Sequence, residues 1–387
     1  MRCENERVSH DHVIVGLFVW YSFCNVAKSW CAKMDSFALY GKDIPMKKRS
    51  FPRLALITSC KVFLLLALFV AGTIVPANTQ AKSNNAVVPA IQGDLSAHDP
   101  ALIKQGSTWY VFSTGGGIQV RTSKDLITWT RIGDVFSGTP SWVTQTLGNV
   151  PDLWAPDIHF YNGLYYLYYA GSSFGSNNSV IGLATNKTLD PTNPNFHWVD
   201  HGLVIRSTTS NDYNTIDPNL TFDAHNDPWL AFGSFWSGLK LTRLDPSTMK
   251  PPASPTIYSL AERAAPDAIE ASFIVSHGGY YYLFASVDFC CRGVSSTYKI
   301  AVGRASNITG PYYSENGTPM LQGGYTILLQ SSGNVIGPGG QSIYRDANRY
   351  LLVHHYYDGT NNGAIKIQIR SIDWTSDGWL HLSDPVS

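Results

Sequence analysis

Charged side chains are scarce in this sequence, and the two signs cancel. They make up 14% of the 387 residues, and 28 basic residues balance 28 acidic ones, so the formal net charge is zero. A protein that binds nucleic acid or anionic lipid through its surface charge needs an excess of basic residues, and long amphipathic helices need charged faces. The composition therefore argues against a nucleic-acid partner and against an all-helical fold.

Cysteine is rare beyond the N-terminal region, and the common cofactor motifs are missing. Four of the six cysteines lie in the first 60 residues, and the other two, Cys290 and Cys291, are adjacent, so no disulfide framework can hold the fold together. The adjacent pair can form a vicinal disulfide or remain as two thiols. The sequence has no phosphate-binding glycine loop, zinc-ligand spacing, calcium loop or nucleophile elbow.

No apolar run is long enough for a comfortable membrane span of ~20 residues. Val62–Val75 is uncharged and mostly apolar, follows a basic stretch, and precedes the small residues Ala77 and Ala81. This order is typical of a secretory signal, with an uncleaved membrane anchor as the alternative. A start at Met46 would give the signal an ordinary length, so we predict export to the extracellular space.

Aromatic residues, glycine and proline are abundant, which favours short strands joined by tight turns. An aromatic-rich strand recurs five times at intervals of roughly 50 to 70 residues, and each time a further strand of alternating character follows it. Propeller blades are four-stranded sheets with repeats of this order. We therefore predict an all-β, five-bladed β-propeller, whose repeats are marked by Trp109, Tyr165, Trp229, Tyr281 and Tyr350.

These patterns divide the chain into four parts. The predicted parts are an upstream extension or mis-called start over residues 1–45, a signal peptide over 46–81, a linker over 82–97 and the catalytic propeller over 98–387.

A distinctive residue precedes each marker at the start of the predicted innermost strand. Four of these five residues are acidic in a chain with few acids, and together they are Asp99, Asp157, Asp217, Glu270 and Gly340. Innermost strands surround the central channel of a propeller. We therefore expect carboxyl groups that are distant in sequence to meet at the channel, which would hold the active site.

Converging carboxyl groups are typical of a glycosidase. One protonates the leaving oxygen, another acts as base or nucleophile, and a third can raise the pKa of the acid by like-charge repulsion. The surplus of aromatic residues fits a sugar ligand. The alternatives are that these acids only bind backbone amides, or that they hold a cation such as calcium, which takes six to eight oxygen ligands.

Seven short motifs, in order, resemble those of the arabinan endo-1,5-alpha-L-arabinosidases of glycoside hydrolase family 43. The resemblance covers about residues 95–380, and the motifs are His98–Pro100, Leu153–Ile158, Ser173–Gly175, Ile216–Pro218, Gly233–Trp236, Ile269–Ala271 and Cys290–Tyr298. It implies a five-bladed propeller that hydrolyses internal α-1,5 bonds of arabinan with inversion at the anomeric carbon.

The resemblance also implies roles for individual residues. Asp99 matches the general base that activates water, Glu270 the general acid, and Asp217 the carboxylate that orients the acid and raises its pKa. On the substrate side of the site, Trp154 and Phe174 match stacking aromatics, Ser234 matches a polar contact to the sugar, and Asp157 is expected to support the site.

One position departs from the family pattern. Gly340 stands where relatives often have a histidine that helps to hold an ion or water cluster in the channel, and Gln341 and His355 are the candidate substitutes. We expect that no cofactor is required for the chemical step, and the sequence leaves a structural calcium in the channel as an open question.

The same sequence is compatible with neighbouring functions. A β-xylosidase or α-L-arabinofuranosidase would keep the three carboxyl groups but close the pocket, and a non-catalytic carbohydrate-binding propeller would lack an acid or a base. The expected partner is the polysaccharide arabinan. No protein partner is implied, and we predict a monomer.

Overall fold

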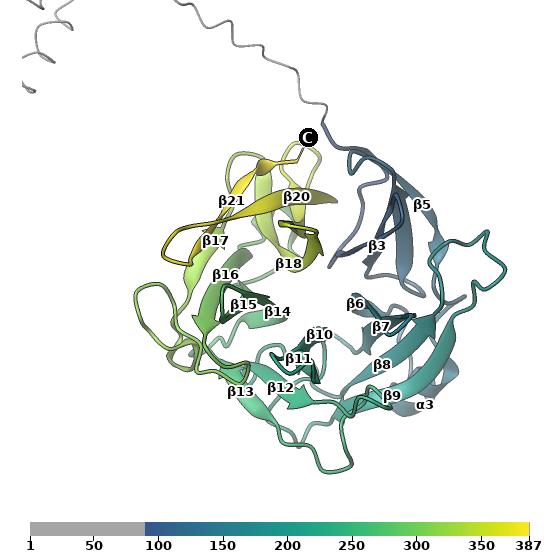
Figure 1. Ribbon diagram of the computed structural model, residues 1–387, viewed down its shortest axis with the longest axis horizontal. Coiled ribbons are helices and arrows are strands. Elements are labelled where there is room, and N and C mark those ends of the chain that lie inside the picture. The colour runs from purple at the N-terminus through teal and green to yellow at the C-terminus, as the bar shows by residue number, and fades with distance from the viewer. Residues whose placement is uncertain (1–89, 387) are drawn as a thin grey trace, which may run out of the picture. The chain divides into compact units, whose positions relative to one another are not determined.

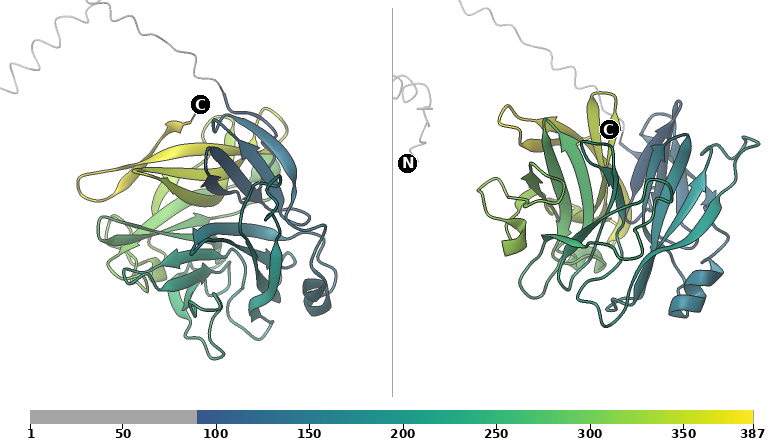
Figure 2. Two further views of the ribbon diagram at one scale, coloured as in Figure 1. Left: turned by 45° about the vertical axis from the view of Figure 1, so that its right-hand side comes forward. Right: turned by 60° about the horizontal axis from the view of Figure 1, so that its bottom comes forward.

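The computed structural model describes residues 90–386. In this part the chain forms five sheets around a central axis, each a blade of a β-propeller (Figure 1). Within every blade four consecutive strands run from the innermost to the outer position through antiparallel pairings, and blade I has β1 as an additional outer strand. The predicted all-β, five-bladed architecture is confirmed, and Figure 2 shows the same blades from two further directions.

The blades follow one another in chain order. Blade I contains β1 (Gln92–Gly93), β2 (Ala101–Gln105), β3 (Thr108–Ser113), β4 (Gln119–Ser123) and β5 (Thr128–Asp134). Blade II contains β6 (Trp154–Tyr161), β7 (Leu164–Gly171), β8 (Ser179–Asn186) and β9 (Val199–Ser207), and blade III contains β10 (Asn219–Phe222), β11 (Pro228–Phe232), β12 (Leu239–Arg243) and β13 (Tyr258–Ala261). Blade IV contains β14 (Ile269–His277), β15 (Tyr280–Val287), β16 (Lys299–Ala305) and β17 (Thr326–Leu329), and blade V contains β18 (Val335–Asp346), β19 (Arg349–Asp358), β20 (Ala364–Trp374) and β21 (Leu380–Pro385).

Three short helical segments lie in the connections, namely α3 (Ser141–Leu147), η1 (Gly293–Ser295) and η2 (Met320–Gln322). Within residues 90–386 no helix has both the length and the apolar character needed to cross a bilayer.

The aromatic strands that mark the repeats are the second strands of the blades, β3, β7, β11, β15 and β19. They are apolar on both faces because each blade packs against two neighbours. In β7, Leu167 and Tyr169 belong to the core between blades I and II, whereas Tyr168 belongs to the core between blades II and III. A sheet buried on both faces explains why these strands read as continuous apolar runs rather than as alternating ones.

Blade I begins earlier than the sequence indicated. Strand β1 pairs in parallel with β5, and the carbonyl oxygen of Leu95 accepts a hydrogen bond from the amide of Ile367 in blade V. The predicted linker spans residues 82–97, and its last residues, from Gln92 onward, are thus part of the propeller. Side-chain packing between Trp109 of blade I and Leu351 of blade V, among others, closes the ring.

Near the start of every innermost strand, an equivalent residue with positive φ lies where the chain passes the channel. These equivalent residues are Asp99, Ala155, Asp217, Ala271 and Gly340, with φ between 41° and 57°. The register predicted from the repeats therefore holds for Asp99, Asp217 and Gly340 only. Glu270 precedes its equivalent position by one residue, and Asp157 follows its own by two, which sends these two side chains in different directions.

Candidate active site

A pocket of about 930 Å³ lies over the propeller axis, since residues from all five blades line it. Asp99, Asp217 and Glu270 line this pocket together, although they come from three different blades. The convergence of these three carboxyl groups was expected from the repeats. Trp154, Phe174 and Ser234 line the same pocket, whereas Asp157 does not.

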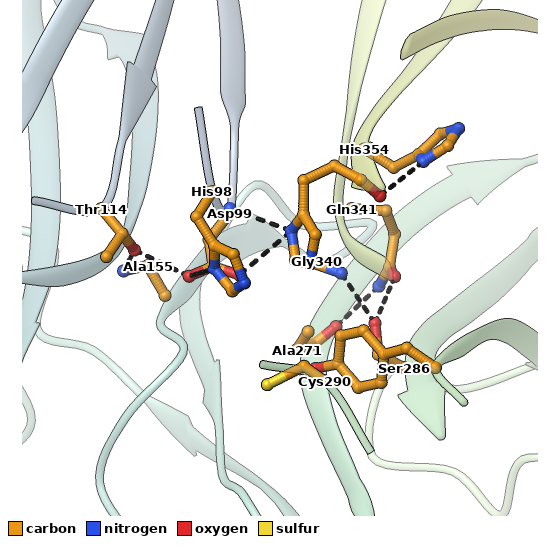
Figure 3. A network of polar contacts seen from close by, with 12 residues as sticks. His98, Asp99, Thr114, Ala155, Ala271, Ser286, Cys290, Gly340, Gln341 and His354 are labelled. Carbon is orange, nitrogen blue, oxygen red and sulfur yellow. Dashed lines mark hydrogen bonds and ion pairs between the residues drawn. The ribbon is translucent and has the colours of Figure 1, made fainter. Parts of the chain in front are cut away.

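Two side chains, those of His98 and Thr114, hydrogen-bond to one carboxylate oxygen of Asp99 (Figure 3). His98 Nδ1 lies 2.8 Å from Oδ2, and the hydroxyl of Thr114 donates to the same oxygen at 2.7 Å. Burial alone would raise the pKa of Asp99, but the charge and hydrogen bond of His98, with smaller contributions from His355 and Thr114, lower it to about 2. Asp99 is therefore ionised at any ordinary pH, as a general base must be.

His98 lies between the Asp99 carboxylate and two residues of blade V. Its Nε2 lies 2.9 Å from the hydroxyl of Tyr357, and its ring stacks on that of His355 with 3.7 Å between centroids. Burial opposes the charge on His98, yet the neighbouring Asp99 outweighs it and raises the pKa of His98. The sequence pointed to His98 only as part of a motif, and it gave no sign that Tyr357 lies beside it.

Glu270 lies in a different environment on blade IV. The hydroxyl of Ser234 donates to Oε2 and the hydroxyl of Tyr298 donates to Oε1, both at 2.6 Å. Burial raises the pKa of Glu270, these two donors lower it, and the negative charge of Asp99 raises it again, so that the net direction is upward. A carboxyl group with a raised pKa keeps its proton longer, which suits a general acid.

Asp217 faces the same space from blade III. The amide of Ala271 donates to its Oδ2 at 2.9 Å, and Ala271 is the residue after Glu270. Burial, then the negative charges of Glu270 and Asp99, raise the pKa of Asp217 well above its usual range. Because Asp217 and Glu270 repel each other, the pair retains a proton to higher pH than either carboxyl group would alone.

Asp157 has a structural position outside the pocket. It is 3% exposed, and its Oδ2 accepts hydrogen bonds from the amide of Leu220 at 2.6 Å and from the side chain of Asn219 at 3.4 Å. It therefore ties blade II to blade III beneath the pocket. Asp157 lies after the bulge in β6, whereas Glu270 lies before the corresponding bulge in β14, so the two acids occupy different positions in their strands.

Aromatic side chains from two blades line the pocket together with the carboxyl groups. On blade II, the rings of Trp154 and Phe174 lie 5.2 Å apart, and Phe174 is 80% exposed. On blade IV, in the loop after β15, Arg292 lies over the ring of Phe289 at 4.1 Å. Sequence reasoning named the first pair but missed the second, because no repeat register marks the loop after β15.

The adjacent cysteines form a disulfide in this loop. Cys290 and Cys291 are bonded to each other and both line the pocket. The amide of Cys291 donates to the hydroxyl of Tyr357 at 2.7 Å, which links the loop to His98 and hence to Asp99.

The side chains around Gly340 do not make a calcium site. A Cβ atom at Gly340 would lie 2.4 Å from Asp99 Oδ1 and 2.7 Å from His355 Nδ1, so His355 fills the space of a side chain at this position. The grouped donors of His98, Asp99 and His355 include two imidazoles, unlike the all-oxygen set that calcium prefers. Gln341 instead joins blades IV and V by binding Ala271 and Ser286 (Figure 3).

A family model for glycosyl hydrolases family 43 matches residues 88–380. The chain is 50% identical over 288 residues to the extracellular endo-alpha-(1->5)-L-arabinanase 1 of Bacillus subtilis (strain 168), an alignment that covers 73% of this chain and 86% of that protein. It is also 40% identical over 302 residues to the extracellular exo-alpha-(1->5)-L-arabinofuranosidase ArbA of Cellvibrio japonicus, covering 75% and 87% of the two chains.

A solved structure with the same architecture is that of Cellvibrio cellulosa alpha-L-arabinanase complexed with arabinohexaose. It superposes with a TM-score of 0.72 at 39% sequence identity and covers 75% of this chain and 96% of that one.

Proposed function

The chain belongs to glycosyl hydrolases family 43 and is a glycosidase, and we propose that it hydrolyses internal α-1,5-L-arabinofuranosidic bonds of arabinan with inversion of configuration. The observation that carries this proposal is the opposite perturbation of two carboxyl groups in one pocket, with the pKa of Asp99 lowered to about 2 and that of Glu270 raised.

In the proposed reaction, Asp99 takes a proton from a water molecule as the oxygen of that water attacks the anomeric carbon. The bond from this carbon to the leaving oxygen breaks, and Glu270 transfers its proton to that oxygen. Asp99 ends protonated and Glu270 ionised, and exchange with solvent restores both. A single displacement by water inverts the anomeric configuration.

Asp217 contributes through its charge and its contact with the segment that carries the acid. Its carboxylate repels negative charge on Glu270 and so favours the protonated form of that residue. Its hydrogen bond to the amide of Ala271 fixes the backbone next to Glu270. Both contributions fit the role of orienting the acid and raising its pKa.

The size and lining of the pocket support an oligomeric substrate. Its volume of about 930 Å³ is at the upper end of the ~300–1,000 Å³ typical of ligand pockets, which is more than one pentose needs. Aromatic rings from two blades, Trp154 with Phe174 and Phe289 beside Arg292, line the pocket, and each group can contact a sugar unit of its own. This arrangement favours internal cleavage.

Release of sugar from the chain end is the second candidate, because one relative at 40% identity is named an exo-acting arabinofuranosidase. The two modes differ in their first products. We expect linear arabinan to lose viscosity early and to give a range of oligosaccharides. Arabinose or a single short product from the first minutes would contradict internal cleavage. Faster release of sugar from xylan would favour a xylosidase, and binding without turnover would favour a carbohydrate-binding propeller.

Export and a monomeric state complete the proposal. The predicted signal peptide over 46–81 and the extension over 1–45 lie outside the described residues, and secretion is supported by the order of basic, apolar and small residues and by relatives named extracellular. N-terminal sequencing of protein from the medium should find a start soon after Ala77 or Ala81, and light scattering should give the mass of a single chain.

A further inference from the structure

The two oxygens of the Glu270 carboxyl group have different hydroxyl partners. Ser234 donates to Oε2 and Tyr298 to Oε1, each at 2.6 Å. The two hydroxyl groups come from different blades, since Ser234 follows β11 and Tyr298 precedes β16. Each carboxyl oxygen thus accepts a hydrogen bond from one hydroxyl group, and the two bonds together prevent the carboxyl group from rotating about its bond to the side chain.

Tyr298 is the more rigid of the two partners. The residue is 2% exposed, and its amide donates to the carbonyl of Phe289. A Cβ atom at Gly339 would lie only 2.1 Å from Cδ1 of its ring, so the ring lies directly against the backbone of β18. The ring of Tyr298 also stacks with that of His355, with 6.0 Å between the two centroids.

A phenolic hydrogen prefers the plane of its ring, whereas the hydrogen of a serine hydroxyl rotates freely. Within the described residues the hydroxyl of Tyr298 has one hydrogen-bond partner, Glu270 Oε1. A proton on Oε1 would compete with the Tyr298 hydrogen for this contact and leave a buried donor unpaired, which is unfavourable. A proton on Oε2 requires only that Ser234 rotate its hydrogen toward the pocket and accept.

We infer that Tyr298 is a positioning residue of the hydrolytic reaction: it keeps Oε1 of Glu270 as a hydrogen-bond acceptor and so places the transferable proton on Oε2. This inference rests on the proposed function of Glu270 as the general acid. As the proton leaves for the glycosidic oxygen, Glu270 becomes a carboxylate, and the hydrogen bond from Tyr298 strengthens because its acceptor is now charged. The contact is therefore worth more in the transition state than in the ground state.

The ionisable groups around Glu270 set the direction of the expected pH effect. The charge of Asp99 raises the pKa of Glu270 and that of His98 lowers it, while the charges of Glu270 and Asp99 raise the pKa of Asp217. Burial, followed by the neighbouring carboxylates, raises the pKa of Tyr298 itself well above its usual range, so its hydroxyl remains a donor. Removing this donor takes away a contact that favours ionised Glu270.

The test is Tyr298→Phe, which keeps the ring and removes the hydroxyl. On linear arabinan kcat should fall about 10- to 100-fold, the expected effect of losing a hydrogen bond to a charged group, with KM changed less than about twofold. The basic limb of the kcat/KM profile should move to higher pH. On a 4-nitrophenyl arabino-oligosaccharide, whose leaving group needs little protonation, the loss should be much smaller.

Tyr312→Phe is the matched control, because Tyr312 is equally buried and its hydroxyl donates to the carbonyl of Ile308 away from the pocket. It should alter thermal stability without altering the dependence on the leaving group. Equal losses on both substrates for Tyr298→Phe, with an unmoved basic limb, would overturn the inference. Inactive wild-type protein on arabinan would instead overturn the proposed function.

A second measurement covers the case in which Tyr298→Phe does not fold. Site-specific replacement of Tyr298 by 3-fluorotyrosine keeps the ring and hydroxyl but makes the hydroxyl a stronger donor. The basic limb should then move to lower pH, opposite to Tyr298→Phe. No movement, or movement to higher pH, would contradict the inference.

Discussion

Blade I and blade IV each bring one carboxyl group into the same pocket, and the pKa values of the two groups are shifted in opposite directions. Asp99 in blade I contacts a histidine, and the pKa of Asp99 is lowered to about 2. Glu270 in blade IV contacts two neutral hydroxyl groups that lower its pKa, but burial, helped by the negative charge of Asp99, outweighs them and raises it. Burial pushes both pKa values upward, and it is overcome only at Asp99, where the partner is a charged histidine.

This comparison shows how a repeated fold can build an asymmetric site. All five blades pass the channel with the same positive-φ geometry, but only the side chains beside each turn determine whether a carboxyl group is held charged or neutral. A pair of titratable groups with separated pKa values is the usual arrangement for base and acid.

Replacing Glu270 should give the largest effect on the acid side. Glu270→Gln keeps the size and the hydrogen-bond acceptor but has no acidic proton, so turnover of arabinan should fall by ~10²- to 10⁴-fold. Binding of an arabino-oligosaccharide, measured by calorimetry, should change little. A turnover close to that of the wild type would remove Glu270 from its role as general acid.

Replacing Asp217 should give an intermediate effect. The negative charge of Glu270 raises the pKa of Asp217, and this repulsion is mutual. Asp217→Asn removes it, so the acid should lose its proton at lower pH and the basic limb of the pH–rate profile should move to lower pH, with a loss of rate of about tenfold or more.

Asp157→Asn is the matched control for Asp217→Asn, because Asp157 is a buried acid that binds Leu220 away from the pocket. This variant should lower stability and leave the pH profile in place. A profile that moves in Asp157→Asn and not in Asp217→Asn would contradict the comparison.

Replacing His98 should give the smallest effect at neutral pH. In His98→Asn an amide can replace the Nδ1 donor, but the positive charge that lowers the pKa of Asp99 is lost. The pKa of Asp99 should rise, so the acidic limb of the pH–rate profile should move to higher pH. At neutral pH the loss of activity should be less than about tenfold. His201→Asn, on the outer strand β9 beside Thr185, should leave the acidic limb unchanged.

The blades could be predicted from the sequence because their second strands are buried on both faces. This burial produces runs such as Leu164–Ala170 that no surface strand would carry. The convergence of Asp99, Asp217 and Glu270 followed from the same repeats. The predicted register was off by two residues at Asp157 and by one at Glu270, because the bulges in β6 and β14 are not visible in the amino-acid pattern.

The partners of the carboxyl groups could not be predicted in the same way. Tyr357 and His355 reach His98 and Asp99 only because blade V closes against blade I, and Tyr298 reaches Glu270 from a loop. These contacts join residues that no local periodicity relates. They nevertheless determine which carboxyl group is charged.

The configuration of the first product tests the central claim most directly. If Asp99 activates one water molecule while Glu270 protonates the leaving oxygen, proton NMR at early times should detect reducing ends in the β configuration from the α-linked substrate. Reducing ends that first appear in the α configuration would mean that a covalent intermediate forms, and would contradict the assignment of Asp99 as a base toward water.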